Sequence, residues 1–261
     1  MKKPSRLDYA YAVGRVRTLE NRLVSKPAFR EAAEEKDLSG ALKVIFDAGY
    51  FFEESIEIKG SSQLDAFLER EGQRLYKLLS ELLLETEILQ ILKGESNLEN
   101  MLHLSQSLNY PFITDYIRHR IDLGNLKIFC RIKYLGLPAQ RLSSFLLKGG
   151  FLDLDILIRG FELTFSELEE ILYASAYQQV WASATDALGE KETFVDLERT
   201  FEDFLMFYLR KAKYIVFGPE PVFGYGLGKM RELQLVRLLG IGKINHVPPE
   251  VLKERISETY V

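Results

Sequence analysis

Apolar residues recur at three- and four-residue spacing along almost the whole chain, which is the period of an amphipathic helix. The longest stripe comprises Leu64, Phe67, Leu68, Leu75, Leu78, Leu79 and Leu82. Such a stripe forms one continuous face of a helix and predicts that this face is buried. Only Ser55–Lys59 and Tyr214–Phe217 resemble strands, and both are too short to found a sheet. The pattern therefore predicts an all-α fold.

Capping residues and prolines predict where several helices begin and end. Asp37 precedes a periodic stretch that stops at Gly49, so we expect an N-cap at the first and a C-terminal stop at the second. Pro27, Pro111 and Pro248 stand where other periodic stretches begin, as proline does in a first helical turn. No apolar run approaches the roughly 18 residues of a membrane span, and the N-terminus lacks the apolar segment of a signal peptide. We expect a cytoplasmic protein.

Two stretches of the chain match each other without gaps, residues 111–142 and residues 221–252. The matched pairs include Pro111 with Pro221, Asp122 with Glu232, Lys133 with Lys243, and Pro138 with Pro248. Residues 27–30 give a weaker match to residues 138–141. Chance similarity between amphipathic helices is the alternative, but a stack of helical modules explains the common register better. We expect an N-terminal module over residues 1–108 and a C-terminal module over residues 109–261.

The motifs that suggest chemistry do not meet the requirements of known sites. The glycine-rich stretch 224–229 lacks the spacing of a phosphate-binding loop or a dinucleotide fingerprint, so close packing of a neighbouring helix is favoured there. The three histidines are scattered, with no metal-ligand spacing. Asp153 and Asp155 suit a helix start better than a metal site. We therefore predict no catalytic residue, no cofactor and no metal.

Composition narrows the possible partners. The chain has 261 residues, of which 47% are hydrophobic and 28% charged, and its net charge of −4 does not favour nucleic acid. The region from Tyr208 to the C-terminus is basic and the remainder acidic, so the basic end could face anionic lipid or an acidic protein; an ordinary solvated surface is the alternative. The single cysteine, Cys130, permits no intramolecular disulfide and is expected to be buried.

Charged residues interrupt the apolar faces of the two matched stretches. Lys229 and Glu232 lie three residues apart on one predicted helical face, and Arg118 and Asp122 cluster in the same way on the other. Buried charges are costly unless they are paired. Two interpretations stay open: internal ion pairs that fix the register between helices, or a polar lining that grips an inserted partner helix. Arg15, in the first predicted helix, could contribute to such a lining.

The C-terminal part of the sequence resembles a known family. The residues that carry the resemblance are Phe217–Val222, Tyr225, Lys229, Glu232, Arg237, Gly242–Asn245 and Pro248–Arg255. They are similar to the C-terminal signature of the C (d) subunit of the central stalk in V/A-type rotary ATPases. Ile121–Lys127 resembles the internal repeat motif of that family, and Tyr11–Glu20 resembles its first helix.

The resemblance implies a funnel of repeated helical modules that sits on the membrane rotor ring and receives the tip of the central shaft. It implies a non-catalytic subunit that binds no nucleotide, couples the shaft to the ring, and reaches the cytoplasmic face of the membrane through these partners. The expected partner-binding residues are Arg15, Arg118, Asp122, Glu220, Tyr225, Lys229, Glu232, Arg237 and Lys243.

Two features depart from the family pattern. The family usually has three modules, whereas this sequence shows two repeat spans, so we expect a partial funnel. Met230 and Leu235 stand where the family tends to have an acidic residue and an asparagine. A general helical-repeat scaffold or adaptor without a rotary role is the alternative function, and an all-helical enzyme is disfavoured because no set of residues supplies its chemistry.

Overall fold

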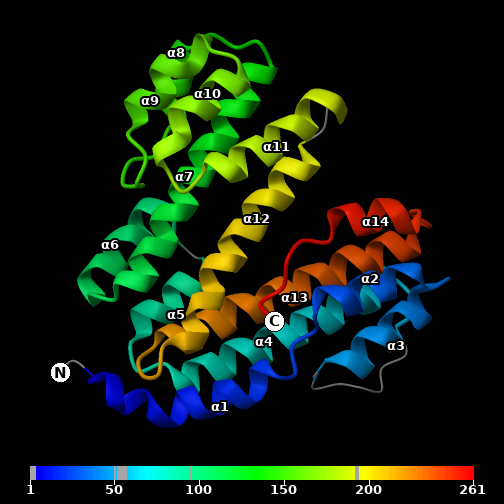
Figure 1. Ribbon diagram of the computed structural model, residues 1–261. Helices are drawn as coiled ribbons and strands as arrows, with labels where there is room; N and C mark the ends of the chain where they lie inside the picture. The colour runs from blue at the N-terminus through cyan, green and yellow to red at the C-terminus, as the bar shows by residue number, and fades with distance from the viewer. Residues whose placement is uncertain (1–3, 50, 52–57, 95, 192–193) are drawn as a thin grey trace. The chain divides into compact units, whose positions relative to one another are not determined.

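The computed structural model describes residues 4–49, 51, 58–94, 96–191 and 194–261 (Figure 1). Every regular element within these ranges is a helix, which confirms the all-α prediction. Tyr214 ends a short 3₁₀ helix and residues 215–217 have no regular structure, so the strand-like stretch Tyr214–Phe217 is not a strand. Of the other strand-like stretch, Ser55–Lys59, residues 55–57 lie outside the described residues. None of the described helices is long and apolar enough to cross a membrane.

Contacts divide the chain into two compact units. Unit 1 comprises Met1–Glu95 together with Met206–Val261, and unit 2 comprises Ser96–Leu205. The sequence led us to expect two consecutive modules with a boundary between residues 108 and 109. The contacts instead group the C-terminal segment with the N-terminal one. Whether repeated modules form a funnel stays a prediction.

Unit 1 is built around one long helix, α13. Its elements are η1 (Arg6–Tyr9), α1 (Ala10–Glu20), α2 (Lys26–Glu34), α3 (Leu38–Ala48), α4 (Ser61–Leu82), α5 (Thr86–Lys93), η4 (Lys211–Tyr214), α13 (Glu220–Ile244) and α14 (Pro249–Arg255). Helix α13 packs beside α4 and also contacts α1, α2, α3 and α5 (Figure 1). All seven apolar residues of the predicted stripe are buried on α4, which confirms that prediction.

Unit 2 is built around α7. Its elements are α6 (Leu98–Leu108), α7 (Pro111–Tyr134), α8 (Gln140–Phe145), α9 (Leu154–Arg159), η2 (Gly160–Glu162), α10 (Phe165–Ile171), η3 (Leu172–Ala174), α11 (Gln178–Lys191) and the first part of α12 (Val195–Arg210). Helix α7 packs against α6 and α8. Its apolar face joins Leu157, Trp181 and Phe201 in a core that also holds Cys130, whose predicted burial is confirmed.

The predicted helix ends are confirmed where local chemistry decides them. The side chain of Asp37 accepts a hydrogen bond from the Gly40 N–H at the start of α3, and Gly49 follows the last residue of that helix. The three prolines lie within or immediately before the first turns of α2, α7 and α14. Asp153 is the N-cap of α9, where its carboxylate accepts the N–H of Asp155. Caps of this kind satisfy backbone donors that have no partner within the helix.

The two long helices, α7 and α13, end in the same motif. Gly136 and His246 follow their last turns with φ of 63° and 54°. The next residue in each case, Leu137 or Val247, donates its N–H to a carbonyl five residues earlier, at 3.1 and 2.9 Å. This is a Schellman motif, which satisfies otherwise unpaired carbonyls at a helix end. The two sequence stretches that match each other therefore share a helix and the way in which it stops.

Candidate functional site

Glu232 lies in the middle of α13 and is only 2% exposed. One carboxylate oxygen accepts the N–H of Val24 at 2.7 Å, and the other pairs with the ammonium of Lys229 on the preceding turn. The same ammonium lies 4.0 Å from the centre of the Phe51 ring. Burial raises the pKa of Glu232, and Lys229 opposes that rise. The structure therefore brings Lys229 and Glu232 together as an internal ion pair, the first of the two interpretations that the sequence left open.

Lys243 lies further along α13 and is also buried. Its ammonium donates to the carbonyl oxygen of Ala33 at 2.6 Å and to that of Glu35, at the C-terminal end of α2. Carbonyls in the last turn of a helix have no intrahelical donor, so a cation there is favourable. Glu232 meanwhile binds the backbone just before α2 begins. We call Glu232 and Lys243 the α13 clamp, because they hold α2 at both ends.

Asp122 occupies the matching position on α7 and is fully buried. Its carboxylate accepts the N–H of Phe151 at 2.7 Å, the N–H of Leu152 at 3.2 Å and the hydroxyl of Tyr177 at 2.8 Å. Burial raises the pKa of Asp122, and these hydrogen bonds oppose the rise. The bound backbone comes just before α9, as Val24 comes just before α2.

Lys133 binds the C-terminal end of the α9 and η2 segment, as Lys243 binds the C-terminal end of α2. Its ammonium donates to the carbonyl of Phe161 at 2.5 Å, where η2 continues α9. Asp122 and Lys133 therefore form an α7 clamp. Arg118, expected to sit beside Asp122, donates to the Gly150 carbonyl at 3.0 Å and stacks on the Phe151 ring at 3.9 Å. Each clamp fixes a short helix against a long one within its own unit.

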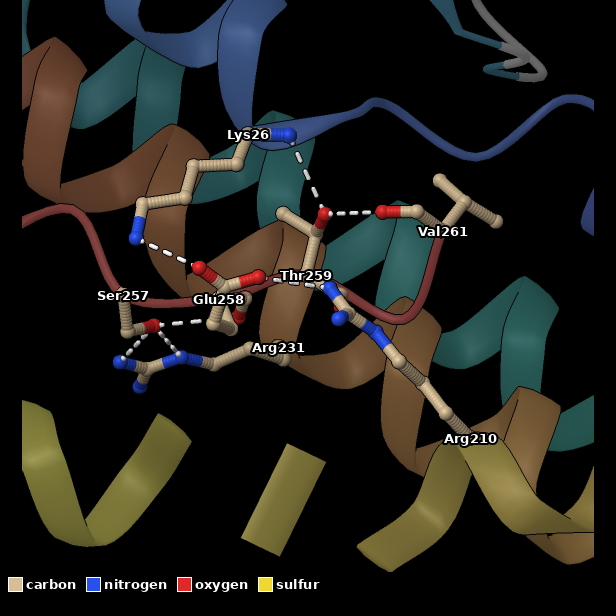
Figure 2. A network of polar contacts seen from close by, with 7 residues as sticks. All are labelled: Lys26, Arg210, Arg231, Ser257, Glu258, Thr259 and Val261. Carbon is tan, nitrogen blue, oxygen red and sulfur yellow. Dashed lines mark hydrogen bonds and ion pairs between the residues drawn. The ribbon is translucent and has the colours of Figure 1, made fainter. Parts of the chain in front are cut away.

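A network of ion pairs and hydrogen bonds ties the C-terminal segment to the rest of unit 1 (Figure 2). Glu258 lies between the ammonium of Lys26 and the guanidinium of Arg210, at 2.7 Å from each. Arg231 on α13 donates twice to the hydroxyl of Ser257, at 2.8 and 2.6 Å. Three cations from three helices thus hold two adjacent residues of the segment. Nothing in the sequence pattern pointed to this network, because its members are far apart in the chain.

Glu220 and Tyr225, two further residues expected to bind a partner, are buried in unit 1. Glu220 is the first residue of α13 and accepts two hydrogen bonds from the guanidinium of Arg6, at 2.9 and 3.0 Å. Gly218 leads into this pair with φ of 116°, and a Cβ there would lie 2.3 Å from the Glu220 carboxylate. These contacts fasten η1 to the start of α13.

Arg15 and Arg237 are the predicted partner-binding residues that lie at the surface of unit 1. Arg15 is exposed on α1 and donates to the hydroxyl of Tyr11 at 3.3 Å. Arg237 on α13 forms an ion pair with Asp65 at 3.1 Å, and both side chains are more than half exposed. Pairs of this kind in solvent are weak and can be exchanged for contacts with another molecule.

The glycine-rich stretch 224–229 packs closely against other parts of unit 1. A Cβ on Gly228 would lie 2.6 Å from the Cβ of Tyr260, and one on Gly224 would lie 2.9 Å from Ala212. The sequence predicted close packing of a neighbouring helix here. The group that packs on Gly228 is instead Tyr260, which lies in the C-terminal segment outside any helix. The Tyr260 hydroxyl also donates to Glu20 at 3.1 Å. Gly224 and Gly228 therefore leave room for the side chain of Tyr260 against α13.

The described residues contain no group of three His, Cys, Asp or Glu side chains able to hold a metal ion. His119 contacts the hydroxyl of Tyr177 through Nδ1 at 2.6 Å. Burial raises the pKa of the Cys130 thiol, so it stays protonated at neutral pH. Asp153 and Asp155 lie at a helix start, where the sequence placed them. The polar side chains described above mainly hold helices together.

The chain matches the family of the ATP synthase (C/AC39) subunit over residues 72–255, which is more than two thirds of its length. It belongs to this family. The match confirms the resemblance to the C subunit of V/A-type ATPases. The matched region also includes the charged residues of both clamps, which are Asp122, Lys133, Glu232 and Lys243.

Two curated relatives of this C/AC39 chain show how far the likeness extends. The C subunit of the V-type sodium ATPase of Enterococcus hirae is 27% identical over 157 residues, which are 60% of this chain and 47% of the relative. The C subunit of the A-type ATP synthase of Thermococcus kodakarensis is 31% identical over 155 residues, which are 56% of this chain and 39% of the relative. The chain thus spans less than half the length of these two relatives.

Proposed function

We propose that this chain is a non-catalytic central-stalk subunit of a V/A-type rotary ATPase or ATP synthase. In this role it couples the rotating shaft to the rotor ring in the membrane. The match to the C/AC39 family over residues 72–255 carries the proposal. The names of the relatives support it, because both are C subunits of complexes that are named as a sodium ATPase or an ATP synthase.

The two clamps support a role in transmitting force. A subunit that passes torque must not yield where its helices meet. Helix α7 has 24 residues and α13 has 25, and each is fastened to a short helix at two points by charged groups. Asp122, Glu232 and Lys243 are buried, and Lys133 is half-buried. Close-packed interiors have low compressibility and transmit strain. Each unit is therefore stiff along its long helix.

Partner contacts are assigned to the surface residues among those predicted. Asp122, Glu220 and Glu232 bind backbone or cations of their own chain. We propose that Arg15 and Arg237 contact the shaft or the ring. Through these partner subunits the chain reaches the cytoplasmic face of the membrane. Mutating exposed charges usually changes association more than folding.

Co-purification from native membranes tests the proposal. We expect the tagged protein, extracted in mild detergent, to recover the ring and shaft subunits of the ATPase. The double variant Arg15→Glu with Arg237→Glu should recover less of them. Arg159→Glu is the matched control, since Arg159 is an exposed arginine on α9 with only a weak surface ion pair to Asp155. Recovery of neither partner by the unaltered protein contradicts the proposal and favours the general scaffold.

A further inference from the structure

A cavity of about 470 Å³ opens in unit 2, between the start of α9 and the end of α10 with η3. Its walls are mainly apolar and include Phe151, Ile156, Ile171, Leu172, Tyr177 and the ring of His119. Pockets of this size that are mostly apolar with a few polar groups are typical of binding sites. None of the predicted partner-binding residues lines it.

In unit 1, the end of α3 packs closely against the segment just before α2. Val24 precedes α2 as Leu152 precedes α9, and each donates its N–H to a clamp carboxylate. At the end of α3, a Cβ on Gly49 would lie 2.4 Å from the Val24 side chain and 3.0 Å from the Phe51 ring. At Gly49, the surroundings of the α13 clamp therefore leave no room for an added methyl group.

The floor of the cavity is a fixed aromatic surface. Burial and the neighbouring Asp122 raise the pKa of Tyr177, so its hydroxyl stays protonated and donates a hydrogen bond to the Asp122 carboxylate. The Tyr177 oxygen then accepts from Nδ1 of His119. The ring of His119 lies 4.8 Å from that of Phe151 and 5.0 Å from that of Phe204. Aromatic walls of this kind favour an aromatic guest, through stacked and edge-to-face contacts.

The mouth of the cavity is apolar and exposed. Phe151 and Ile171 line the cavity and remain 45% and 44% exposed, and the adjoining Tyr173 is 75% exposed. A cluster of exposed large apolar side chains around a pocket is unusual on a surface that only meets water. Aromatic anchor residues that fill such pockets commonly dominate the binding energy of protein interfaces.

One acidic side chain belongs to the wall of the cavity, and another lies next to a wall residue in the sequence. Asp153 lines the cavity, and the exposed Glu170 directly precedes Ile171. Arg118 stacks on Phe151, but its positive charge is offset by the buried Asp122 nearby. The carboxylate of Asp153 therefore favours positive charge beside an inserted group.

We propose that this cavity receives one aromatic side chain of a partner protein, flanked in the partner's sequence by Lys or Arg. The cavity and its aromatic wall select the anchor, and Asp153 selects the flanking charge. This site is separate from Arg15 and Arg237 and does not rest on the rotary function.

Methyl NMR on the isolated protein tests the proposal, with N-acetyl-Lys-Trp-Lys-amide as the probe. Ile156 and Ile171 line the cavity, so their δ1 methyl groups serve as reporters of its occupancy. We expect saturable shifts at these two methyl groups, and at least tenfold weaker shifts with N-acetyl-Glu-Trp-Glu-amide. Equal binding of the two peptides, or no shift at either methyl group, overturns the proposal. Neither result bears on co-purification with the ring and shaft.

Two substitutions separate the cavity from the charge. Ile156→Trp fills the cavity from α9 and should abolish binding of the basic probe, with Ile171 as the remaining reporter. Asp153→Asn removes a charge but keeps an N-cap side chain, because asparagine caps helices about as well as aspartate. It should weaken the basic probe at least threefold. Asp37→Asn, the same change at the N-cap of α3, should leave binding unaltered. If Asp153→Asn and Asp37→Asn weaken binding of the basic probe equally, the assigned site is wrong.

Discussion

In α7 the carboxylate of Asp122 is held by two backbone N–H groups and a tyrosine hydroxyl, whereas in α13 the carboxylate of Glu232 is held by one N–H and an ammonium. At both matched positions a buried carboxylate holds the backbone that precedes a short helix, but the hydrogen-bond donors differ. Neutral donors leave one buried charge, and an ion pair buries two. The second arrangement costs more desolvation and is more damaging to break on one side only.

The segments that follow α8 and α14 differ in the same way. After α8, the Asn125 amide makes two hydrogen bonds of 2.8 Å with the backbone of Leu147. After α14, Ser257 and Glu258 are held by cations, as Figure 2 shows. Around the clamp carboxylate and in the segment after the last short helix, unit 1 therefore uses charged donors where unit 2 uses neutral ones. Acid and salt should act on unit 1 first.

The largest effect is expected at the α13 clamp. Glu232→Ala leaves the Lys229 ammonium buried without its carboxylate and should lower the free energy of unfolding by about 3–5 kcal/mol. Replacing both residues together, Lys229→Met with Glu232→Leu, should recover at least half of that loss. Urea denaturation measures both changes. A double variant as unstable as the single one would show that the charge pair is not the source of the loss.

A smaller effect is expected at the α7 clamp, with a distinctive pH dependence. Asp122→Asn disturbs three hydrogen bonds and should cost about 1–3 kcal/mol. Because burial raises the pKa of Asp122 in the folded state, its contribution is fully present in acid and declines as pH rises through the folded pKa. The cost of the substitution should thus be larger at acidic than at neutral pH. Urea midpoints across this range provide the test, and a cost that grows with pH argues against it.

The opposite pH dependence is expected for Glu258. Burial alone would raise its pKa, but hydrogen bonds from Lys26 and Arg210 lower it below the usual range. Its contribution is therefore present above the unfolded pKa and is lost as pH falls through the folded one. Glu258→Gln should cost about 1 kcal/mol at neutral pH and almost nothing below about pH 4. The cost of Glu258→Gln should therefore rise with pH, whereas the cost of Asp122→Asn should fall. Urea denaturation of both variants across the same pH range tests this difference.

The smallest effect is expected from salt. At about 1 M NaCl the Debye length is roughly 3 Å, so the partly exposed pairs of Glu258 are screened. Amide hydrogen exchange over residues 257–261 should quicken several-fold, whereas the Leu147 amide, bound to the neutral Asn125, should not change. Equal acceleration at both places would contradict the contrast between the units.

Local patterns in the sequence predict much of this fold. The apolar stripe of α4 and the Asp37 cap depend on neighbours a few residues away, so periodicity and propensity suffice to find them. Lys229 and Glu232 were recognised as a pair for the same reason. Their further partner, the Val24 N–H, lies on another helix connection and leaves no trace in the spacing.

The candidate site is harder to predict from the sequence than the helices are, for a physical reason. The clamp lysines bind backbone carbonyls, which every residue possesses, so Ala33 and Phe161 carry no signal in their side chains. The cavity of unit 2 depends on how closely two short helices approach, which composition does not determine. Partner binding by Arg15 and Arg237 stays a prediction, because it depends on surfaces outside this chain.

Coupling itself can be measured most directly in vesicles that contain the ATPase complex with and without this subunit. ATP hydrolysis and ion uptake are followed together. The account predicts that the complex without the subunit still hydrolyses ATP but moves few ions, and that adding the purified subunit restores ion uptake per ATP. Full ion uptake in its absence would contradict a coupling role.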